Sequence, residues 1–256
     1  MRRAAKLILF IFSLVFIGSC AHMQTNFQQK ILPRESFVKI EKSLSIHACE
    51  DNTSCADTLL RSVASGVVVY TGVRGAYVLT AAHVCDDSDV KDKYKKLPKV
   101  KFTGDFMVRD LDNDRKPVEI LEFNTKHDIC MLWVKNLFLP PIVISPSAPK
   151  PGDRVFNISA PLGIFSKNMV PIFEGFYNGT DEAGNALYSM PSIGGSSGSP
   201  ITNRKGELIG MVHSTIRFFN QIAISPNYKA LREFINESID NHSSRSYFHT
   251  VWRSFI

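Results

Sequence analysis

The sequence lacks the marks of several protein classes. Its 256 residues contain no internal repeat, no low-complexity tract and, beyond the first twenty residues, no apolar run that could span a bilayer. Five cysteines are present, but there is no Cys-x-x-Cys pair and no nearby set of histidine ligands, so we expect neither a metal nor another cofactor. With 44% hydrophobic and 21% charged residues, the chain is an ordinary globular protein with one large or two small cores.

The excess of basic residues does not indicate a nucleic-acid partner. The formal charge is +6, but Arg2, Arg3 and Lys6 lie in a segment that we expect to be removed, and +3 remains without them. The other basic residues are scattered, and their one cluster, residues 91–96, is interrupted by an aspartate. We therefore expect a solvated loop there and no nucleic-acid binding.

The first twenty residues have the organisation of an export signal. A basic start is followed by apolar residues 7–17, a run too short for a stable membrane helix, and then by Gly18, Ser19 and Cys20. This ending resembles the bacterial lipobox, in which small residues precede a cysteine that becomes lipid-modified and N-terminal. We expect an exported protein that faces the periplasm or the cell exterior and contacts a membrane through a lipid on Cys20. The alternative is an ordinary signal peptide cut elsewhere, with Cys20 incidental.

Four cysteines remain when Cys20 is set aside, an even number that suits an oxidising compartment. Four cysteines permit three pairings, and the sequence alone does not choose among them. Cys49 and Cys55 enclose a short polar loop that suits a local bridge, which would leave Cys85 to pair with Cys130.

The pattern of apolar residues predicts an all-β protein. Short alternating or fully apolar runs are separated by Gly, Pro, Asn and Asp, which is typical of a sandwich or barrel. One long helix is predicted over about residues 226–240, with Leu231 and Ile235 on its apolar face. The expected strands cover residues 65–71, 75–80, 100–106, 118–124, 129–134, 154–159, 171–177, 186–190, 200–202, 208–214 and 221–224.

A proline-rich stretch over residues 139–152 divides the predicted strands into two groups of similar size. The domain organisation expected from these signals is a signal peptide with a lipobox over 1–20, a polar leader over 21–59, a globular domain over 60–240 and a C-terminal tail over 241–256.

A histidine and an aspartate stand where general acid–base chemistry would need them. His83 follows an apolar strand and two alanines, so its imidazole has room at the edge of a barrel, and we predict that it is a general base. Asp128 stands at the mouth of another apolar strand, whereas Asp86, Asp87 and Asp89 are closer to His83 in sequence but lie in a polar loop. Asp128 is therefore predicted to accept a hydrogen bond from the His83 ring and to orient it.

The predicted nucleophile is Ser197, in the segment Ile-Gly-Gly-Ser-Ser-Gly-Ser-Pro over residues 193–200. Its flanking glycines allow a tight turn that exposes the hydroxyl and lets backbone N–H groups converge. We predict that the N–H groups of Gly195 and Ser197 form an oxyanion hole. Each of the three segments is common by itself. Their joint occurrence in the order His, Asp, Ser indicates a catalytic triad.

The same segments resemble the three motifs of trypsin-like serine peptidases. They read Thr-Ala-Ala-His up to His83, Asp-Ile-Cys-Met-Leu from Asp128, and Gly-Ser-Ser-Gly-Ser-Pro around Ser197. The bacterial glutamyl endopeptidase and HtrA-type branches are the most similar. Further matches are Ser-Gly-Val-Val-Val from residue 65, Pro-Gly-Asp-Arg-Val from residue 151 and Leu-Ile-Gly-Met-Val from residue 208, so the resemblance covers about residues 60–238.

The resemblance implies a chymotrypsin-like fold of two six-stranded antiparallel β-barrels with a C-terminal helix. Barrel one would cover about residues 60–140, barrel two about 150–225 and the helix about 226–240, with the triad in the cleft between the barrels. It also implies a serine endopeptidase that acts on a protein or peptide substrate through an acyl-enzyme on Ser197. No PDZ-sized region follows the helix, so we expect a chain without that HtrA domain. The oligomeric state is left open.

Departures from the family pattern also carry information. Nothing resembles the Ile-Val-Gly-Gly start of the digestive proteases, and Ser196 replaces the acid with which their liberated N-terminus pairs, so that activation is not expected. By analogy, Ser192, His213 and Ser214 are candidates for the substrate pocket. Glutamyl endopeptidases use a pocket histidine to meet an acidic side chain, but His213 stands one residue too far along when counted from Gly210. Its ring could instead point to the other side of the strand.

Two other functions stay open. A protease fold can serve as a binding protein without catalysis, because fold does not fix function. An esterase could use the same triad, although nothing like the strand-to-helix serine elbow of the α/β-hydrolases is present.

Overall fold

The computed structural model describes residues 32–50 and 54–253, with side chains described up to residue 242. Contacts divide the chain into Met1–Leu32 and Pro33–Ile256, and every element below lies in the second unit. The signal peptide over 1–20, Cys20 and most of the predicted leader therefore lie outside the described residues. Within the described part, no helix is long and apolar enough to cross a membrane.

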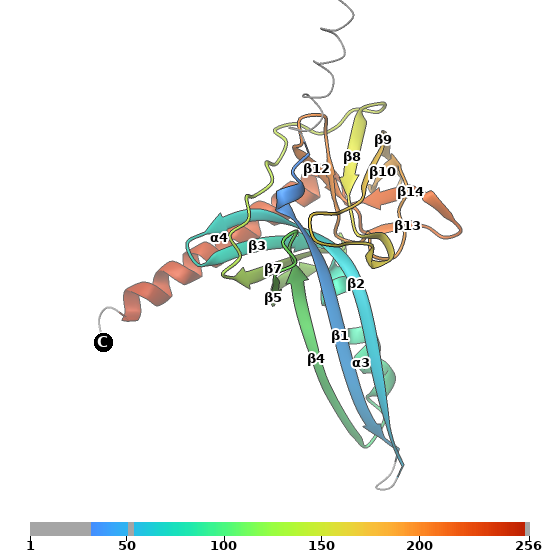
Figure 1. Ribbon diagram of the computed structural model, residues 1–256, viewed down its shortest axis with the longest axis vertical. Helices are drawn as coiled ribbons and strands as arrows, with labels where there is room; N and C mark the ends of the chain where they lie inside the picture. The colour runs from blue at the N-terminus through green and yellow to red at the C-terminus, as the bar shows by residue number, and fades with distance from the viewer. Residues whose placement is uncertain (1–31, 51–53, 254–256) are drawn as a thin grey trace, which may run out of the picture. The chain divides into compact units, whose positions relative to one another are not determined.

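The first half of the unit is a seven-stranded sheet in which neighbouring strands are antiparallel (Figure 1). Its strand order is β5-β4-β1-β2-β3-β7-β6. Its strands are β1 (Phe37–Cys49), β2 (Cys55–Gly72), β3 (Gly75–Thr80), β4 (Lys99–Arg109), β5 (Arg115–Pro117), β6 (Glu119–Asn124) and β7 (Ile129–Lys135).

The second half is another seven-stranded antiparallel sheet, in the order β12-β11-β8-β9-β10-β14-β13. Its strands are β8 (Arg154–Ile158), β9 (Ile172–Thr180), β10 (Ala186–Ser189), β11 (Pro200–Thr202), β12 (Leu208–Met211), β13 (Ser214–Ile216) and β14 (Phe219–Ser225). The all-β, chymotrypsin-like fold class is thus confirmed, with seven strands in each sheet where six were expected.

The structure differs from the sequence-based expectation at one predicted strand and at the predicted leader. The strand expected over 208–214 is split into β12 and β13, because the chain leaves the ladder at Val212 and His213. The predicted leader over 21–59 contains β1 and the start of β2, so the first sheet begins well before residue 60. Alternate residues of β1 are apolar, among them Val38, Ile40 and Ile46, and these three are fully buried.

Short helical elements and one long helix complete the unit. The long helix α4 begins at Tyr228, and Leu231 and Ile235 of its apolar face are buried in the core of the first sheet. It extends well beyond residue 240, so the predicted tail continues the helix up to Arg253. The other elements are η1 (Arg34–Ser36), α2 (Ala82–Cys85), α3 (Ser88–Tyr94), η2 (Pro161–Gly163) and α4 (Tyr228–Arg253).

The proline-rich stretch joins the two sheets, as expected, between the end of β7 and the start of β8. Its backbone is tied to both: Ile142 donates to the Val68 carbonyl of β2, and Ser145 donates to the Leu208 carbonyl of β12. Two buried clusters are present. One lies under the first sheet and α4 and includes Leu208 and Met211 of β12, and the other lies within the second sheet. The connection is therefore hydrogen-bonded to both sheets.

Candidate active site

His83 is presented by a short helix that is otherwise buried. Its neighbours Ala82 and Val84 pack into the core of the first sheet, whereas half of the His83 side chain is exposed. The two small alanines that precede it fit without displacing the neighbouring strands, because they add little volume beyond the backbone. The imidazole is therefore fixed at its base and open at its tip.

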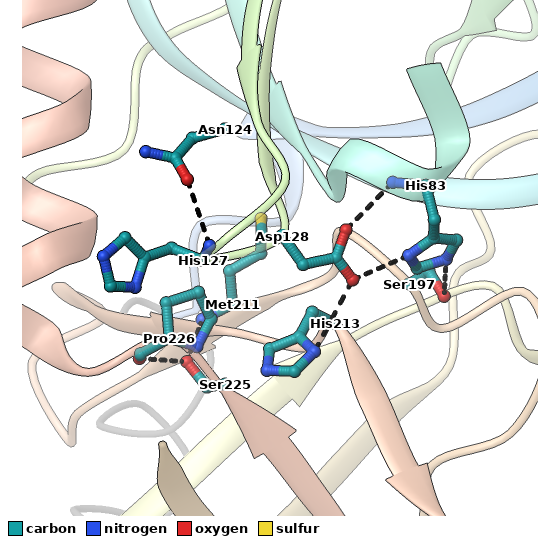
Figure 2. Close-up of polar contacts among 9 residues, drawn as sticks. All are labelled: His83, Asn124, His127, Asp128, Ser197, Met211, His213, Ser225 and Pro226. Atoms are coloured by element: carbon teal, nitrogen blue, oxygen red, sulfur yellow. Dashed lines mark hydrogen bonds and ion pairs between the residues drawn. The ribbon is translucent and has the colours of Figure 1, made fainter. Parts of the chain in front are cut away.

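Asp128 holds the histidine through two hydrogen bonds. The His83 amide donates to Oδ1 at 2.9 Å, and His83 Nδ1 lies 2.8 Å from Oδ2 (Figure 2). Because an ionised carboxylate only accepts, Nδ1 carries the ring proton and Nε2 is left as the acceptor. Burial tends to raise the pKa of Asp128, but the hydrogen bonds from His83 outweigh it and hold that pKa below its ordinary value.

Asp128 also has an unusual backbone. Its φ of 51° lies in the left-handed region, which aspartate and asparagine tolerate better than most residues. This conformation occurs in the turn immediately before β7. It aims the carboxylate back towards α2 instead of along the strand (Figure 2).

Both predicted disulfides are confirmed. Cys85 bonds to Cys130, and Cys49 bonds to Cys55. The first links the end of α2 to β7, so it ties the elements that carry His83 and Asp128. The second closes the tip of the β1–β2 hairpin.

Ser197 completes a continuous chain of hydrogen bonds. Its Oγ lies 3.0 Å from His83 Nε2, the nitrogen that the tautomer leaves free to accept a proton. Figure 2 shows the two side chains meeting on the side of the imidazole that faces away from Asp128. The structure thus brings together all three predicted triad residues, with each polar atom in reach of the next.

The backbone before Ser197 is held so that N–H groups face outward. The Gly194 carbonyl accepts a hydrogen bond from Leu162 at 2.7 Å, and because the two ends of a trans peptide point in opposite directions, the Gly195 N–H points away from Leu162. Within the described part of the chain, neither the Gly195 nor the Ser197 N–H has a hydrogen-bond partner. Both predicted oxyanion-hole donors are therefore available to an oxygen beside Ser197.

Gly195 must be a glycine here. Its φ is +95°, and a Cβ at this position would lie 2.5 Å from the Ala160 carbonyl and 2.8 Å from the Leu162 nitrogen. Both are backbone atoms, so a side chain at this position would require the backbone around residues 160–162 to move.

Ser65 of β2 is a site residue to which the sequence assigned no role. It is fully buried, and its Oγ donates to the Gly195 carbonyl at 2.8 Å while accepting from the Ala160 amide at 3.0 Å. Its own amide donates to the Ser197 carbonyl at 2.8 Å. Ser65 therefore connects the first sheet to both ends of the nucleophile loop. The only signal for it was its place in the Ser-Gly-Val-Val-Val match.

Ser196, which stands where the digestive proteases have an acid, is buried. Its Oγ lies 3.2 Å from the hydroxyl of Ser159, which gives it a partner inside the fold. The hydrogen bond between Ser159 and Ser196 thus helps to hold the nucleophile loop without an ion pair to an N-terminus.

The three predicted pocket residues differ in their surroundings. His213, a pocket candidate by analogy, lies beside the triad: its Nδ1 is 3.5 Å from Asp128 Oδ2, the same oxygen that His83 Nδ1 contacts (Figure 2). The chain has left the strand ladder at this residue, so counting along β12 does not predict the direction of its ring. Ser192 is buried and its amide donates to Asn220, whereas Ser214 is exposed at the start of β13.

Burial lowers the pKa of His213, and the Asp128 carboxylate opposes this only in part. His213 is therefore neutral over the neutral pH range and adds no positive charge beside the triad. The imidazoles of His83 and His213 both contact Oδ2 of Asp128.

The described residues contain one group of metal-type ligands, His47 with Cys49 and Cys55. Both cysteines are in a disulfide, so they offer no thiolate to a metal ion.

Comparisons with known proteins agree with this fold and this constellation. The sequence model of the trypsin-like peptidase domain matches residues 64–211, which is more than half of the chain. Among solved structures, the chain is similar to a serine endoprotease from Yersinia pestis, with a TM-score of 0.61 and 17% identity over 85% of this chain and 67% of that one. At that identity the likeness concerns the fold. No curated protein matches the sequence.

Proposed function

Because this chain belongs to the trypsin-like peptidase family, we propose that it is a serine endopeptidase that cleaves proteins or peptides through an acyl-enzyme on Ser197. One observation carries the proposal. Ser197 Oγ, His83 Nε2, His83 Nδ1 and Asp128 Oδ2 form a continuous relay with distances of 3.0 and 2.8 Å.

In the first half-reaction, Ser197 Oγ attacks the substrate carbonyl carbon as its proton passes to His83 Nε2. Asp128 stabilises the imidazolium that forms, and its lowered pKa keeps it ionised for this role. The negative oxygen of the tetrahedral intermediate accepts hydrogen bonds from the Gly195 and Ser197 amides. When the C–N bond breaks, His83 gives its proton to the leaving amine and an ester remains on Ser197.

In the second half-reaction, water takes the place of the amine. His83 accepts a proton from the water as its oxygen attacks the ester carbonyl, and returns the proton to Ser197 Oγ when the C–O bond breaks. The same donors stabilise the second tetrahedral intermediate, so one arrangement serves both steps.

The experiment is a casein and peptide-library digest with the purified protein and its Ser197→Ala variant. Loss of the serine in a comparable triad lowers turnover by about 10⁶-fold, so cleavage by the variant should fall to background. Ser166→Ala is a matched control, because Ser166 is an exposed serine with no contact to the triad, and it should cleave like the parent. Equal cleavage by the parent and Ser197→Ala would contradict the proposal, and a folded parent without cleavage would favour a binding protein.

We further propose that the protein is exported and anchored by a lipid on Cys20. The support is the basic and apolar organisation of residues 1–17 followed by Gly-Ser-Cys. Metabolic labelling with a palmitate analogue in a bacterial host should mark the parent and leave Cys20→Ser unlabelled. Equal labelling of both, or of neither, would contradict the anchor while leaving the proposed chemistry untouched.

A further inference from the structure

The outer half of β2 presents a strand edge that nothing in the described chain covers. Val67 of β2 pairs with both β1 and β3, and the residues after it pair with β3 up to Gly72. Residues 55–66 pair with β1 alone. From Cys55 to Val63 every residue is exposed except Thr58, which is half-buried. In Figure 1, β1, β2 and β4 run together away from the second sheet, with β2 at the edge of this group.

Such an edge offers a row of unpaired N–H and C=O groups to another strand. Helix α3 packs against β1 and β4: Asp87, its N-cap residue, pairs with Lys42 of β1, and Tyr94 contacts Phe102 of β4. The edge also has apolar side chains in reach of a partner: 52% of Leu59 and 40% of Leu60 are exposed.

The side chains along this edge are complementary to themselves. Side chains alternate along a strand, so Asp57, Leu59 and Arg61 share one face of the sheet. If two copies of β2 pair antiparallel about Leu59, the two leucines lie opposite each other. Each Asp57 then lies opposite the Arg61 of the other copy, because both are two residues from the centre.

Among the described residues, the Asp57 carboxylate is only partly paired and the Arg61 guanidinium has no ion pair. Asp57 accepts from His47 Nδ1 through Oδ1 at 2.7 Å, which leaves its second oxygen free, and its side chain is 85% exposed. Arg61 is exposed and has no ion pair among the described residues.

We propose that residues 57–61 form the centre of a two-fold symmetric dimer, in which β2 of one copy pairs with β2 of a second copy. The outer strands then form one continuous sheet in the order β4-β1-β2 followed by β2-β1-β4 of the partner copy. The same patch serves both copies, which is the commonest symmetry of soluble dimers. The two Asp57–Arg61 pairs set the register by opposing a slip in either direction.

The experiment is sedimentation of the purified protein over a range of concentrations, with single charge reversals at the edge. Asp57→Arg puts two cations opposite each other at both ends of the dimer, and Arg61→Asp puts two anions there. Each variant alone should dimerise at least about tenfold more weakly than the parent. An equimolar mixture should dimerise again, since every cationic strand then faces an anionic one.

Lys101→Asp is the matched control, because Lys101 is an exposed charge on β4, away from the β2 edge, and its reversal should leave dimerisation unchanged. Leu59→Cys provides a second test. A short bis-maleimide should link two copies at this position, while the same reagent should not link the Lys101→Cys variant.

A parent that stays monomeric at every concentration would overturn the proposal, as would a mixture that fails to recover the dimer. A monomer whose residues 57–61 are protected from hydrogen exchange would show that another segment of the same chain covers the edge. None of these results bears on cleavage, because the edge makes no contact with the triad.

Discussion

The two halves of β2 differ in their exposure to solvent. In the inner half, residues 64–69 are all buried and Ser65 touches the nucleophile loop, whereas residues 55–63 stand in solvent. Each half also lies beside a His–Asp pair. His83 and Asp128 are 2.8 Å apart at the inner half, and His47 and Asp57 are 2.7 Å apart at the outer half.

What differs is the environment of each pair. The Asp128 side chain is 23% exposed, whereas that of Asp57 is 85% exposed. The second ring nitrogen of His83 contacts the Ser197 hydroxyl, whereas that of His47 lies 3.6 Å from the disulfide-bonded sulfur of Cys49. A hydrogen-bonded imidazole and carboxylate alone therefore do not make up the site that we propose to be catalytic. Burial, a nucleophile and a nearby pair of free amides make the difference.

The largest expected effect comes from replacing each histidine in turn. His83→Gln removes the base that is hydrogen-bonded to Ser197, and by analogy with a comparable triad kcat should fall by about 10⁶-fold. His47→Gln breaks a pair of the same length and should leave cleavage unchanged. Peptide hydrolysis measured on both variants checks this, and a comparable loss in His47→Gln would remove the distinction between the two regions.

A smaller effect is expected at the turn before the nucleophile. A methyl group on Gly195 would collide with backbone atoms of residues 160 and 162, so Gly195→Ala should displace an oxyanion donor and lower kcat by about 10²- to 10³-fold. Gly152→Ala is the matched control, because its φ of +90° is equally unfavourable but a Cβ there meets nothing within 4 Å.

Comparing kcat for the two alanine variants separates lost geometry from backbone strain. If both variants lose activity equally, strain and not the oxyanion donor explains the loss. If Gly195→Ala is fully active, the Gly195 N–H is not used in the reaction.

The two serines of β2 give the next test. Ser65→Ala leaves the Gly195 carbonyl and the Ala160 amide without their partner, and the loss of one such bond corresponds to about tenfold in rate. As Ser65 acts through the nucleophile loop, kcat should fall while KM stays near its parent value. Ser62→Ala, three residues away in the exposed half, should change neither constant. A rise in KM alone would contradict the positioning role.

The smallest effect concerns stability against pH. Burial lowers the pKa of His213 in the folded state, so the unfolded chain takes up its proton more readily. The parent should therefore lose stability as the pH falls below about 6.5, the ordinary histidine value, and regain it above that value. Asp128 contributes in the same direction but only at lower pH, where its carboxylate is protonated.

His213→Gln should show a flatter dependence between about pH 6.5 and 5, because it has no proton to gain. A difference of about 1 kcal/mol would move Tm by about 2–4 °C, which thermal melts at several pH values resolve. Parallel curves for the two proteins would contradict the burial of a neutral His213.

Much of the site could be predicted from the sequence because its parts are local. His83, Asp128 and Ser197 each stand in a short motif whose neighbours explain the role, and the pairing of Cys85 with Cys130 followed from elimination once a local bridge was assumed. Strand positions such as 75–80 and 200–202 were correct for the same reason, since their apolar runs end at clear turn residues.

What the sequence did not predict depends on contacts between distant segments. Ser65 looks like any strand serine until the second sheet brings Gly195 and Ala160 to its hydroxyl. His213 lies outside the ladder after β12, so nothing in the strand pattern predicted its contact with Asp128. The strand β1 did carry a period-two signal, but its lysines and glutamate made it look like a polar leader.

The central claim is that Ser197 is the nucleophile, and a covalent label tests it most directly. A fluorophosphonate probe, followed by digestion and mass spectrometry, should place a single adduct on Ser197 in the parent and none in His83→Gln. The neighbouring Ser196 and Ser199 are buried and hydrogen-bonded to Ser159 and Asn157, so neither should react. An adduct on either of them, or no adduct in a folded and accessible parent, would contradict the account.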